Sequence, residues 1–359
     1  MTGDADFVKH SNRFSREAPW QQALEDAIPL SWVWERPTSC QTCKQAPDCA
    51  VLPEVAIEFE RSHSTMNDSQ VSPVTDVIEL VPDKLYSVAS TIRLDGNVSS
   101  YPANATGYTK GHCYLLKQGN DALLLDTGYT AHRRAIIASL RQLLTDGDEL
   151  SIYPLRLNEY MSVCNVEMIA QTFRAKQCYS GNPDASLWVG FSRHVERPDD
   201  YVLKTSLVAR RQEIDLGSKG ERKLQAFQAP IRLIGTRWVM DPSTGTLFSS
   251  DSFTHQWSKT THGPWVIDRA DDVAAMPHIR SFLLNTRYWW LEGGKTEELC
   301  AKIDAVRRDY SIERIAPGYG KITEGREAVD LQFDRLIEAL RSLDRSVMPS
   351  AYVDRDLIR

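Results

Sequence analysis

The pattern of hydrophobic and polar positions predicts strands over most of the chain after about residue 75. Short apolar runs separated by turn residues predict strands at residues 77–81, 84–90, 150–157, 223–230, 231–235, 238–242 and 244–251. Within residues 112–128, two apolar runs flank a four-residue turn, which predicts a hairpin. A further strand and a tight loop are expected at residues 312–320.

Helical spacing of apolar residues appears in four segments between and after these strands. The segment 132–147 ends in Gly147, and the others are 165–173, 296–310 and 325–343. Strands and helices therefore interleave twice along the chain, with several hairpins. This order predicts an α/β fold of two sheets packed together, with helices outside them.

Composition and charge describe a soluble globular protein. The chain has 359 residues, of which 42% are hydrophobic and 25% charged. The 42 basic and 48 acidic residues include no long basic run, so we expect no nucleic-acid partner. No stretch approaches the roughly 18 uninterrupted apolar residues of a membrane span, and the N-terminus lacks the apolar core of a signal peptide. We therefore expect a cytoplasmic protein that does not bind membranes.

Residues 1–75 differ from the rest and predict an N-terminal extension. They begin rich in aromatic residues and proline, continue with a cysteine cluster, and end in the polar run 61–73, which is typical of a linker. We expect the main domain at residues 76–345 and a short tail at 346–359.

The cysteine cluster of the extension has metal-ligand spacing. Cys40, Cys43 and Cys49 form a C-x2-C-x5-C pattern, in which two thiolates two residues apart can hold one metal from a tight turn. We predict an iron-sulfur cluster here, with zinc and ordinary thiols or an incidental disulfide as alternatives. The candidates for a fourth ligand are Cys113, Cys164, Cys178, Cys300 and His63.

Four segments of the chain resemble a known family in their order and spacing. The runs LLLDTG at 123–128, LRLNEYMSVCNVEMI at 155–169, the segment 229–253 ending in DPSTGTLFSSDSF, and RIAPGYG at 314–320 resemble the metallo-β-lactamase fold. The resemblance covers roughly residues 76–343 and is closest to the oxygen-reducing diiron domain of flavodiiron proteins. It implies an αββα four-layer sandwich. In that family, a His-x-Glu-x-Asp-His run, two further histidines and an aspartate hold two bridged irons that reduce dioxygen or nitric oxide.

The sequence departs from the family pattern at most of the metal-ligand positions. Two carboxylates are retained, Glu159 and Asp251. The other ligand positions carry residues that match iron poorly: Leu157, Met161, Ser162, Arg232 and Tyr319. We therefore expect no family-type diiron centre.

The retained acids predict a remodelled pocket. We expect Glu159, Asp251, Arg232 and Tyr319 to surround the vacated space, with Arg232 pairing with one of the two carboxylates, because a guanidinium can neutralise an acid once metal ions are gone. The alternative is that both acids are solvent-facing loop residues.

Three histidines offer a different metal site. His112, His132 and His255 lie near the motif segments and, with Glu159 and Asp251, allow a rebuilt mononuclear site. The alternative is that they are scattered structural histidines, since the chain has no His-x-His spacing.

These observations favour a redox protein that binds a small molecule in the remodelled pocket. We expect no flavin mononucleotide domain after the final helix, so electrons would come from the cysteine cluster or from a separate electron-transfer protein. A hydrolase with a mononuclear metal and a non-catalytic scaffold subunit are the alternatives, and an oxidoreductase is favoured over a metallo-hydrolase. Trp289 and Trp290 are expected to be core or interface anchors, which leaves a homodimer open.

Overall fold

The computed structural model describes residues 74–183, 185, 189, 201–217, 220–231 and 235–344. The predicted cysteine cluster at Cys40, Cys43 and Cys49 lies outside the described residues, and so does Arg232. The predictions for these four residues are neither supported nor contradicted by the structure.

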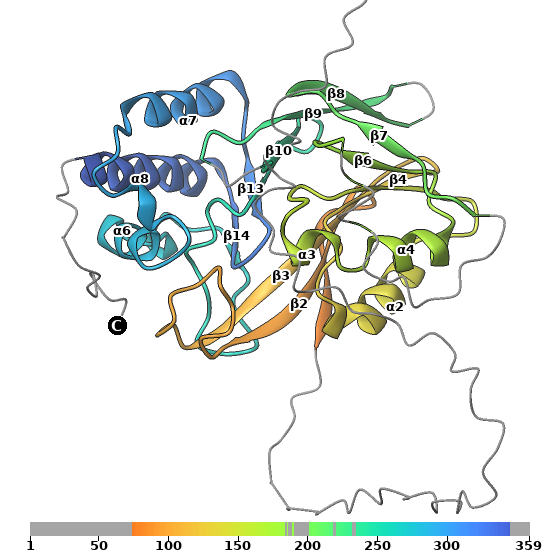
Figure 1. Ribbon diagram of the computed structural model, residues 1–359, viewed down its shortest axis with the longest axis horizontal. Helices are drawn as coiled ribbons and strands as arrows, with labels where there is room; N and C mark the ends of the chain where they lie inside the picture. The colour runs from red at the N-terminus through yellow and green to blue at the C-terminus, as the bar shows by residue number, and fades with distance from the viewer. Residues whose placement is uncertain are drawn as a thin grey trace, which may run out of the picture. The chain divides into compact units, whose positions relative to one another are not determined.

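The first sheet has seven strands in the order of the sequence (Figure 1). They are β1 (Thr75–Val81), β2 (Leu85–Leu94), β3 (Gly107–Gln118), β4 (Asp121–Leu125), β5 (Glu149–Tyr153), β6 (Gln177–Ser180) and β7 (Thr205–Leu207). Strands β1 to β4 pair antiparallel, and β4 to β7 pair parallel. The predicted hairpin is confirmed as β3 and β4.

The second sheet also has seven strands, in the order β12-β14-β13-β11-β10-β9-β8. Their bounds are β8 (Arg211–Leu216), β9 (Arg222–Gln228), β10 (Arg237–Asp241), β11 (Thr246–Ser250), β12 (Val266–Ile267), β13 (Arg314–Pro317) and β14 (Ile322–Glu324). Strands β11 and β13 are parallel neighbours, so their carboxyl ends meet at the same edge of this sheet.

Helices cover the outer faces of both sheets (Figure 1). The helices beside the first sheet are α2 (Arg133–Leu143), α3 (Tyr160–Val163) and α4 (Val166–Phe173). Those beside the second are α6 (Met276–Leu284), α7 (Glu297–Asp309) and α8 (Arg326–Asp344). Short 3₁₀ turns lie at η1 (Thr130–His132), η2 (Ala270–Asp272) and η3 (Trp289–Leu291).

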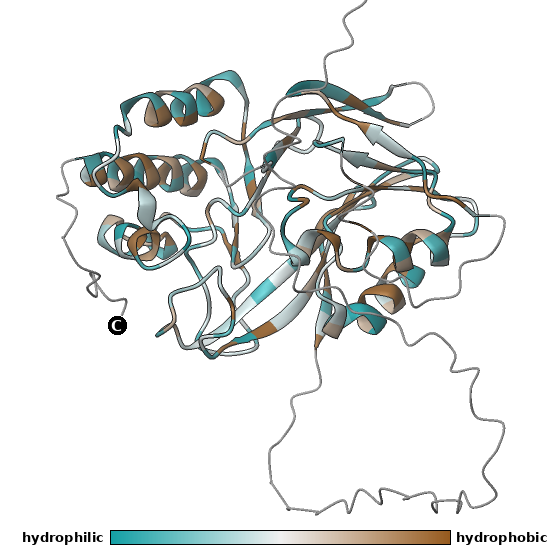
Figure 2. Cartoon of the chain, in the orientation of Figure 1, coloured by the Kyte–Doolittle hydropathy of each residue, from teal (hydrophilic) through white to brown (hydrophobic). Residues whose placement is uncertain are grey.

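Three hydrophobic cores hold these layers together. Leu115 packs with Ile136 and Ile169 under the first helices, and Trp238 packs with Phe333 under the second. A third core between the sheets includes residues from both, such as Leu123 and Phe248. Hydrophobic and polar residues are mixed along α8, as expected of a helix with one buried face (Figure 2). The αββα four-layer sandwich predicted from the sequence is therefore confirmed.

Most of the helices could be predicted from the local spacing of apolar residues. The four predicted helices correspond to α2, α4, α7 and α8, although α2 ends at Leu143, before Gly147, because Leu144 is extended. Helix α6 was not predicted; it has nine residues and a proline in its first turn, which gives a short and ambiguous pattern. Among the described residues, no helix has the length and apolar character needed to cross a membrane.

Candidate functional site

The candidate site lies where strands of both sheets end. Strands β4 and β5 are parallel, as are β11 and β13, and the loops after them converge. In α/β sheets, ligands bind beyond the carboxyl ends of such strands. These loops carry most of the charged and phenolic groups of the site: Asp126, Arg156, Glu159, Asp251 and Tyr319.

Two of these strand ends have a left-handed backbone. Asp126 has a φ of 60° and Ser250 a φ of 56°, which costs a residue other than glycine about 1–3 kcal/mol. The Asp126 carboxylate accepts the backbone N–H of Leu155 at 2.8 Å, and the Ser250 carbonyl accepts the backbone N–H of Gly318 at 2.5 Å. These bonds hold both turns in the geometry that directs the polar side chains into one space.

Arg156 supplies a buried cation at the centre of the site. Its side chain is 1% exposed, its Nη2 lies 3.4 Å from Asp126 Oδ2, and its guanidinium carbon lies 5.2 Å from the centre of the Tyr319 ring. Burial opposes the charge, but Asp126, then Glu159 and more weakly Asp251 raise the pKa of Arg156 above its usual value. Its Nε and Nη1 have no hydrogen-bond partner among the described residues.

Glu159 anchors a chain of hydrogen bonds at the mouth of the site. Arg287 donates to its Oε2 at 2.6 Å, and the Tyr319 hydroxyl donates to its Oε1 at 3.0 Å. Because the single hydroxyl proton of Tyr319 is used there, Tyr129 donates to Tyr319 across 2.7 Å. Burial raises the pKa of Glu159, but Arg156, followed by Arg287 and Tyr319, lowers it to below the ordinary value.

Asp251 is buried without a hydrogen bond to its carboxylate. It is 3% exposed, and neither oxygen has a partner among the described residues. Burial and Glu159 raise the pKa of Asp251, while the charges of Arg156 and Arg287 oppose that shift. The hydroxyl of Tyr288, which donates to the Asp251 backbone carbonyl at 3.2 Å, also opposes it. A cavity of about 10 Å³, lined in part by Thr254, Phe282 and Tyr288, lies beside it and is the size of one water molecule.

The residues of the site do not fit two bridged irons. A buried guanidinium at Arg156 would repel divalent cations placed among Asp126, Glu159 and Asp251. Leu157 belongs to the core under the first helices, and Met161 packs with Tyr319 in a small cluster near the site. Leucine has no lone pair to donate, and burial raises the pKa of Tyr319 well above its usual value, which disfavours the phenolate that would bind iron.

Three of the residues predicted for the pocket come together. Glu159 and Tyr319 are hydrogen bonded, and Asp251 lies close enough to them to raise the pKa of Arg156 and to have its own pKa raised by Glu159. Sequence reasoning did not identify Asp126, Arg156, Arg287 or Tyr129. Asp126 and Arg156 belong to the motif runs at 123–128 and 155–169, so their signal was present, whereas nothing in the sequence around Arg287 points to the site.

Two of the three histidines proposed for a mononuclear metal, His112 and His255, have another role, whereas the Nδ1 of the buried His132 has no hydrogen-bond partner among the described residues. His112 donates from Nε2 to the Gly320 carbonyl at 2.9 Å and accepts from Ser87 at 2.8 Å through Nδ1, so both ring nitrogens are used. His255 Nε2 contacts Gln332 at 3.0 Å. Over the described ranges, no group of three or more His, Cys, Asp or Glu side chains is arranged to hold a metal ion.

We expect the buried histidines to destabilise the domain as pH falls from 6.5 to 5. Burial lowers the pKa of His112 to about 4 and that of His255 to about 3, whereas unfolded histidine takes up a proton near pH 6.5. The unfolded state then binds more protons, so each histidine lowers the unfolding free energy with a slope that approaches about 1.4 kcal/mol per pH unit toward pH 5. Urea titrations at several pH values should show a shallower loss in His255→Gln. The exposed His262→Gln is the control, and equal slopes in His255→Gln and parent would contradict the prediction.

The cysteines of the main domain are mostly poor candidates for a fourth cluster ligand. Cys113, Cys178 and Cys300 are buried, and no disulfide links any cysteine in the described part of the chain. Burial raises the pKa of Cys178 to about 12 and also raises those of Cys113 and Cys300, which disfavours the thiolate that binds metal. Cys164 is half-buried.

Comparisons with known proteins give structural matches only. No family model and no curated protein sequence matches the chain. Rubredoxin oxygen:oxidoreductase of Desulfovibrio gigas is similar at a TM-score of 0.56 and 13% identity, covering 74% of this chain and 62% of that one. A mutant flavodiiron protein of Thermotoga maritima is similar at a TM-score of 0.56 and 15% identity, and the match covers 75% of this chain and 63% of that one. The 1–254 fragment of a diflavin flavoprotein of Nostoc is similar at a TM-score of 0.55 and 12% identity, and the match covers 76% of this chain and 97% of that fragment.

These matches establish the fold. The described domain has the metallo-β-lactamase-like fold seen in flavodiiron proteins, as the sequence motifs predicted. The matched part of this chain spans about three fifths of the first two similar proteins.

Proposed function

We propose that this protein is a redox protein of the flavodiiron fold that works without a diiron centre. In this proposal an iron-sulfur cluster on Cys40, Cys43 and Cys49, or a separate electron-transfer protein, supplies electrons. If zinc occupies the cysteines, only the separate protein can do so. The strand-end site binds a small molecule, and the redox names of the similar structures support this class.

The observation that carries this proposal is the pair of incompletely bonded groups, Arg156 and Asp251. Two guanidinium nitrogens and two carboxylate oxygens are buried without partners among the described residues. Buried polar atoms are seldom left unpaired, because each costs about 1–3 kcal/mol. A small polar molecule with both a donor and an acceptor would satisfy them, donating to Asp251 and accepting from Arg156.

The second candidate is a non-catalytic scaffold subunit. It is favoured by the size of the cavity beside Asp251, about 10 Å³, which admits one water molecule and no larger ligand without movement. In that case the Arg156 and Arg287 networks only stabilise the fold. The hydrolase alternative has less support, because His112 and His255 are engaged in other contacts and the described residues contain no group of three or more side chains arranged to hold a metal ion.

Metal analysis of the anaerobically purified full chain tests the proposal. We expect iron and acid-labile sulfide, together with a visible absorption that disappears in the triple variant Cys40→Ser, Cys43→Ser and Cys49→Ser. Cys164→Ser is the matched control and should keep the absorption. Two irons retained by the triple variant would place a diiron centre at the strand ends and contradict the proposal. Absence of iron from the parent would exclude the iron-sulfur cluster and leave either a separate electron donor or the scaffold candidate.

A further inference from the structure

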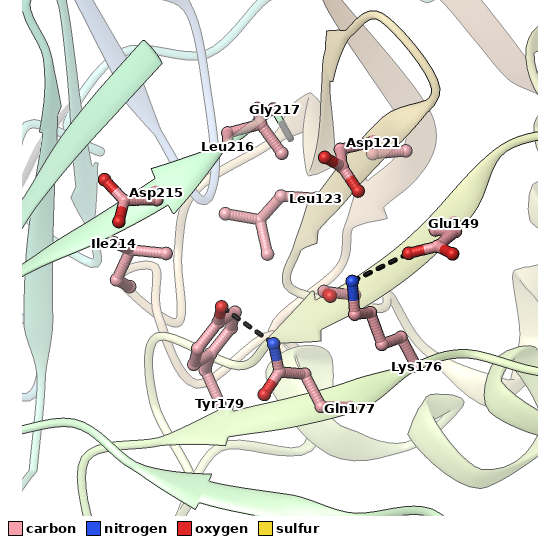
Figure 3. A pocket seen from close by; sticks show the side chains of 12 residues that line it. Asp121, Leu123, Glu149, Lys176, Gln177, Tyr179, Ile214, Asp215, Leu216 and Gly217 are labelled. Atoms are coloured by element: carbon pink, nitrogen blue, oxygen red, sulfur yellow. Dashed lines mark hydrogen bonds and ion pairs between the residues drawn. The ribbon is translucent and has the colours of Figure 1, made fainter. Parts of the chain in front are cut away.

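A second pocket lies at the other end of the same strands (Figure 3). Its volume is about 250 Å³, and it is lined by β4, β5 and β6 of the first sheet and β8 of the second. Asp121 and Glu149 are the first residues of β4 and β5, whereas Asp126 and Arg156 follow the ends of those strands. The pocket is therefore separate from the strand-end site.

The floor of this pocket is the open end of the core between the sheets. Leu123, Ile214 and Leu216 belong to that core, and Tyr179 packs against it. These three aliphatic side chains are 1%, 3% and 5% exposed, so a small apolar floor lies among mostly polar walls, which suits a small organic molecule with one polar end.

A buried hydroxyl group faces the same space. Ser151 lines the pocket and is 8% exposed. Its neighbours Leu150 and Ile152 face the helix-side core, so Ser151 faces the other sheet, opposite Leu123 in the strand register. Within the described residues its side chain makes no hydrogen bond, which leaves this hydroxyl available to a ligand.

The charges around the pocket are predominantly negative. Lys176 pairs with Glu149 at 2.7 Å, so these two charges cancel. Asp121 and Asp215 have no ion pair of their own in the described part of the chain, and Figure 3 shows the Asp121 carboxylate turned toward Leu123. Burial raises the pKa of Tyr179, nearby Lys176 lowers it, and Asp215 and Asp121 raise it more weakly. The negative charge of the pocket therefore lies at the two aspartates rather than at the phenol.

We propose that this pocket binds a small organic ammonium ion with an apolar body. The ammonium group donates to the Asp121 carboxylate and the Ser151 hydroxyl, and the apolar body lies on Leu123 and Ile214 beside the Tyr179 ring. The volume suits a monoamine about the size of benzylamine, at the lower end of ligand-pocket volumes. A bare metal ion would leave the apolar floor uncovered, which favours the organic cation.

Saturation-transfer NMR on the full chain at pH 7 tests this with benzylammonium, benzyl alcohol and benzoate, which share one shape. We expect benzylammonium to bind at least about tenfold more tightly than benzyl alcohol, because only the cation forms an ion pair with the Asp121 carboxylate. Asp121→Asn should weaken binding by about tenfold or more, and Ser151→Leu should block the pocket. Glu213→Gln is the control, because Glu213 is exposed on β8 and pairs with Lys223 at 3.1 Å.

Three outcomes would overturn the proposal. They are equal binding of the cation and the alcohol, unchanged binding in Asp121→Asn, and no saturation transfer from the parent at about 10 mM probe. Tighter binding of benzoate would also overturn it, because the pocket would then recognise an anion through Lys176. The circular dichroism spectrum of each variant shows whether it is folded. None of these results depends on the metal content of the protein, so this proposal and the proposed function fail independently.

Discussion

Arg222→Met is expected to lower the free energy of unfolding by about 3–5 kcal/mol, the range found when one partner of a buried ion pair is removed. The side chains of Arg222 and Asp241 are 1% and 0% exposed. Arg222 Nε lies 3.2 Å from both Asp241 oxygens, and its Nη1 donates to the carbonyls of Lys84 at 3.1 Å and Lys117 at 2.9 Å. One guanidinium therefore joins β9 and β10 of the second sheet to the first.

Urea unfolding at pH 7 measures this loss. The matched control is Arg326→Met, which removes a half-exposed pair with Asp330 at 3.0 Å and should cost less than about 1 kcal/mol. Burial opposes ionisation of Asp241, but the hydrogen bonds and charge of Arg222 lower the pKa of Asp241 in the folded state. The parent should therefore lose this contribution as pH falls below about 3.9. If Arg222→Met lowers the free energy of unfolding by less than about 1 kcal/mol, the buried Asp241 does not need Arg222 as its cation and the prediction is wrong.

The fold was predictable because its elements have strong local patterns. The hairpin of β3 and β4 and the amphipathic helices α7 and α8 each show their period within the segment itself. The order of the strands in the second sheet was not predictable, because β11 pairs with β13 across more than sixty residues. Such pairing is decided by packing between distant segments, which no local pattern reports.

The candidate site was predictable only in part, because some of its contacts join segments that are distant in sequence. Glu159, Asp251 and Tyr319 were identified from motif positions, and the structure brings them together. The cations beside these acids are Arg156 and Arg287, which were not predicted, whereas the predicted pairing of Arg232 lies outside the described residues and remains a prediction. Arg287 is 128 residues from Glu159 in sequence, and no spacing rule links them.

Arg156→Met is expected to destabilise the domain by about 3 kcal/mol, because Asp126 and Asp251 would lose their buried cation. The loss should be smaller than for Arg222→Met, since Arg156 Nε and Nη1 already lack partners among the described residues. Urea unfolding at pH 7 measures it. The matched variant is Arg287→Met, whose side chain is 13% exposed and therefore closer to solvent; its loss should be smaller again.

The double variant Arg156→Met with Asp251→Asn tests whether these two groups act as a pair. Burial raises the pKa of Asp251, so this carboxyl lowers stability as pH rises through its pKa, and removing Arg156 should enlarge that loss. The substituted amide carries no charge, so the double variant should regain about 1 kcal/mol or more relative to Arg156→Met. If the double variant is no more stable than Arg156→Met, the charge of Arg156 does not stabilise the Asp251 carboxylate. Arg232, which the sequence predicts beside this acid, is then the next cation to replace, because a buried carboxyl group that stays ionised needs a neighbouring cation.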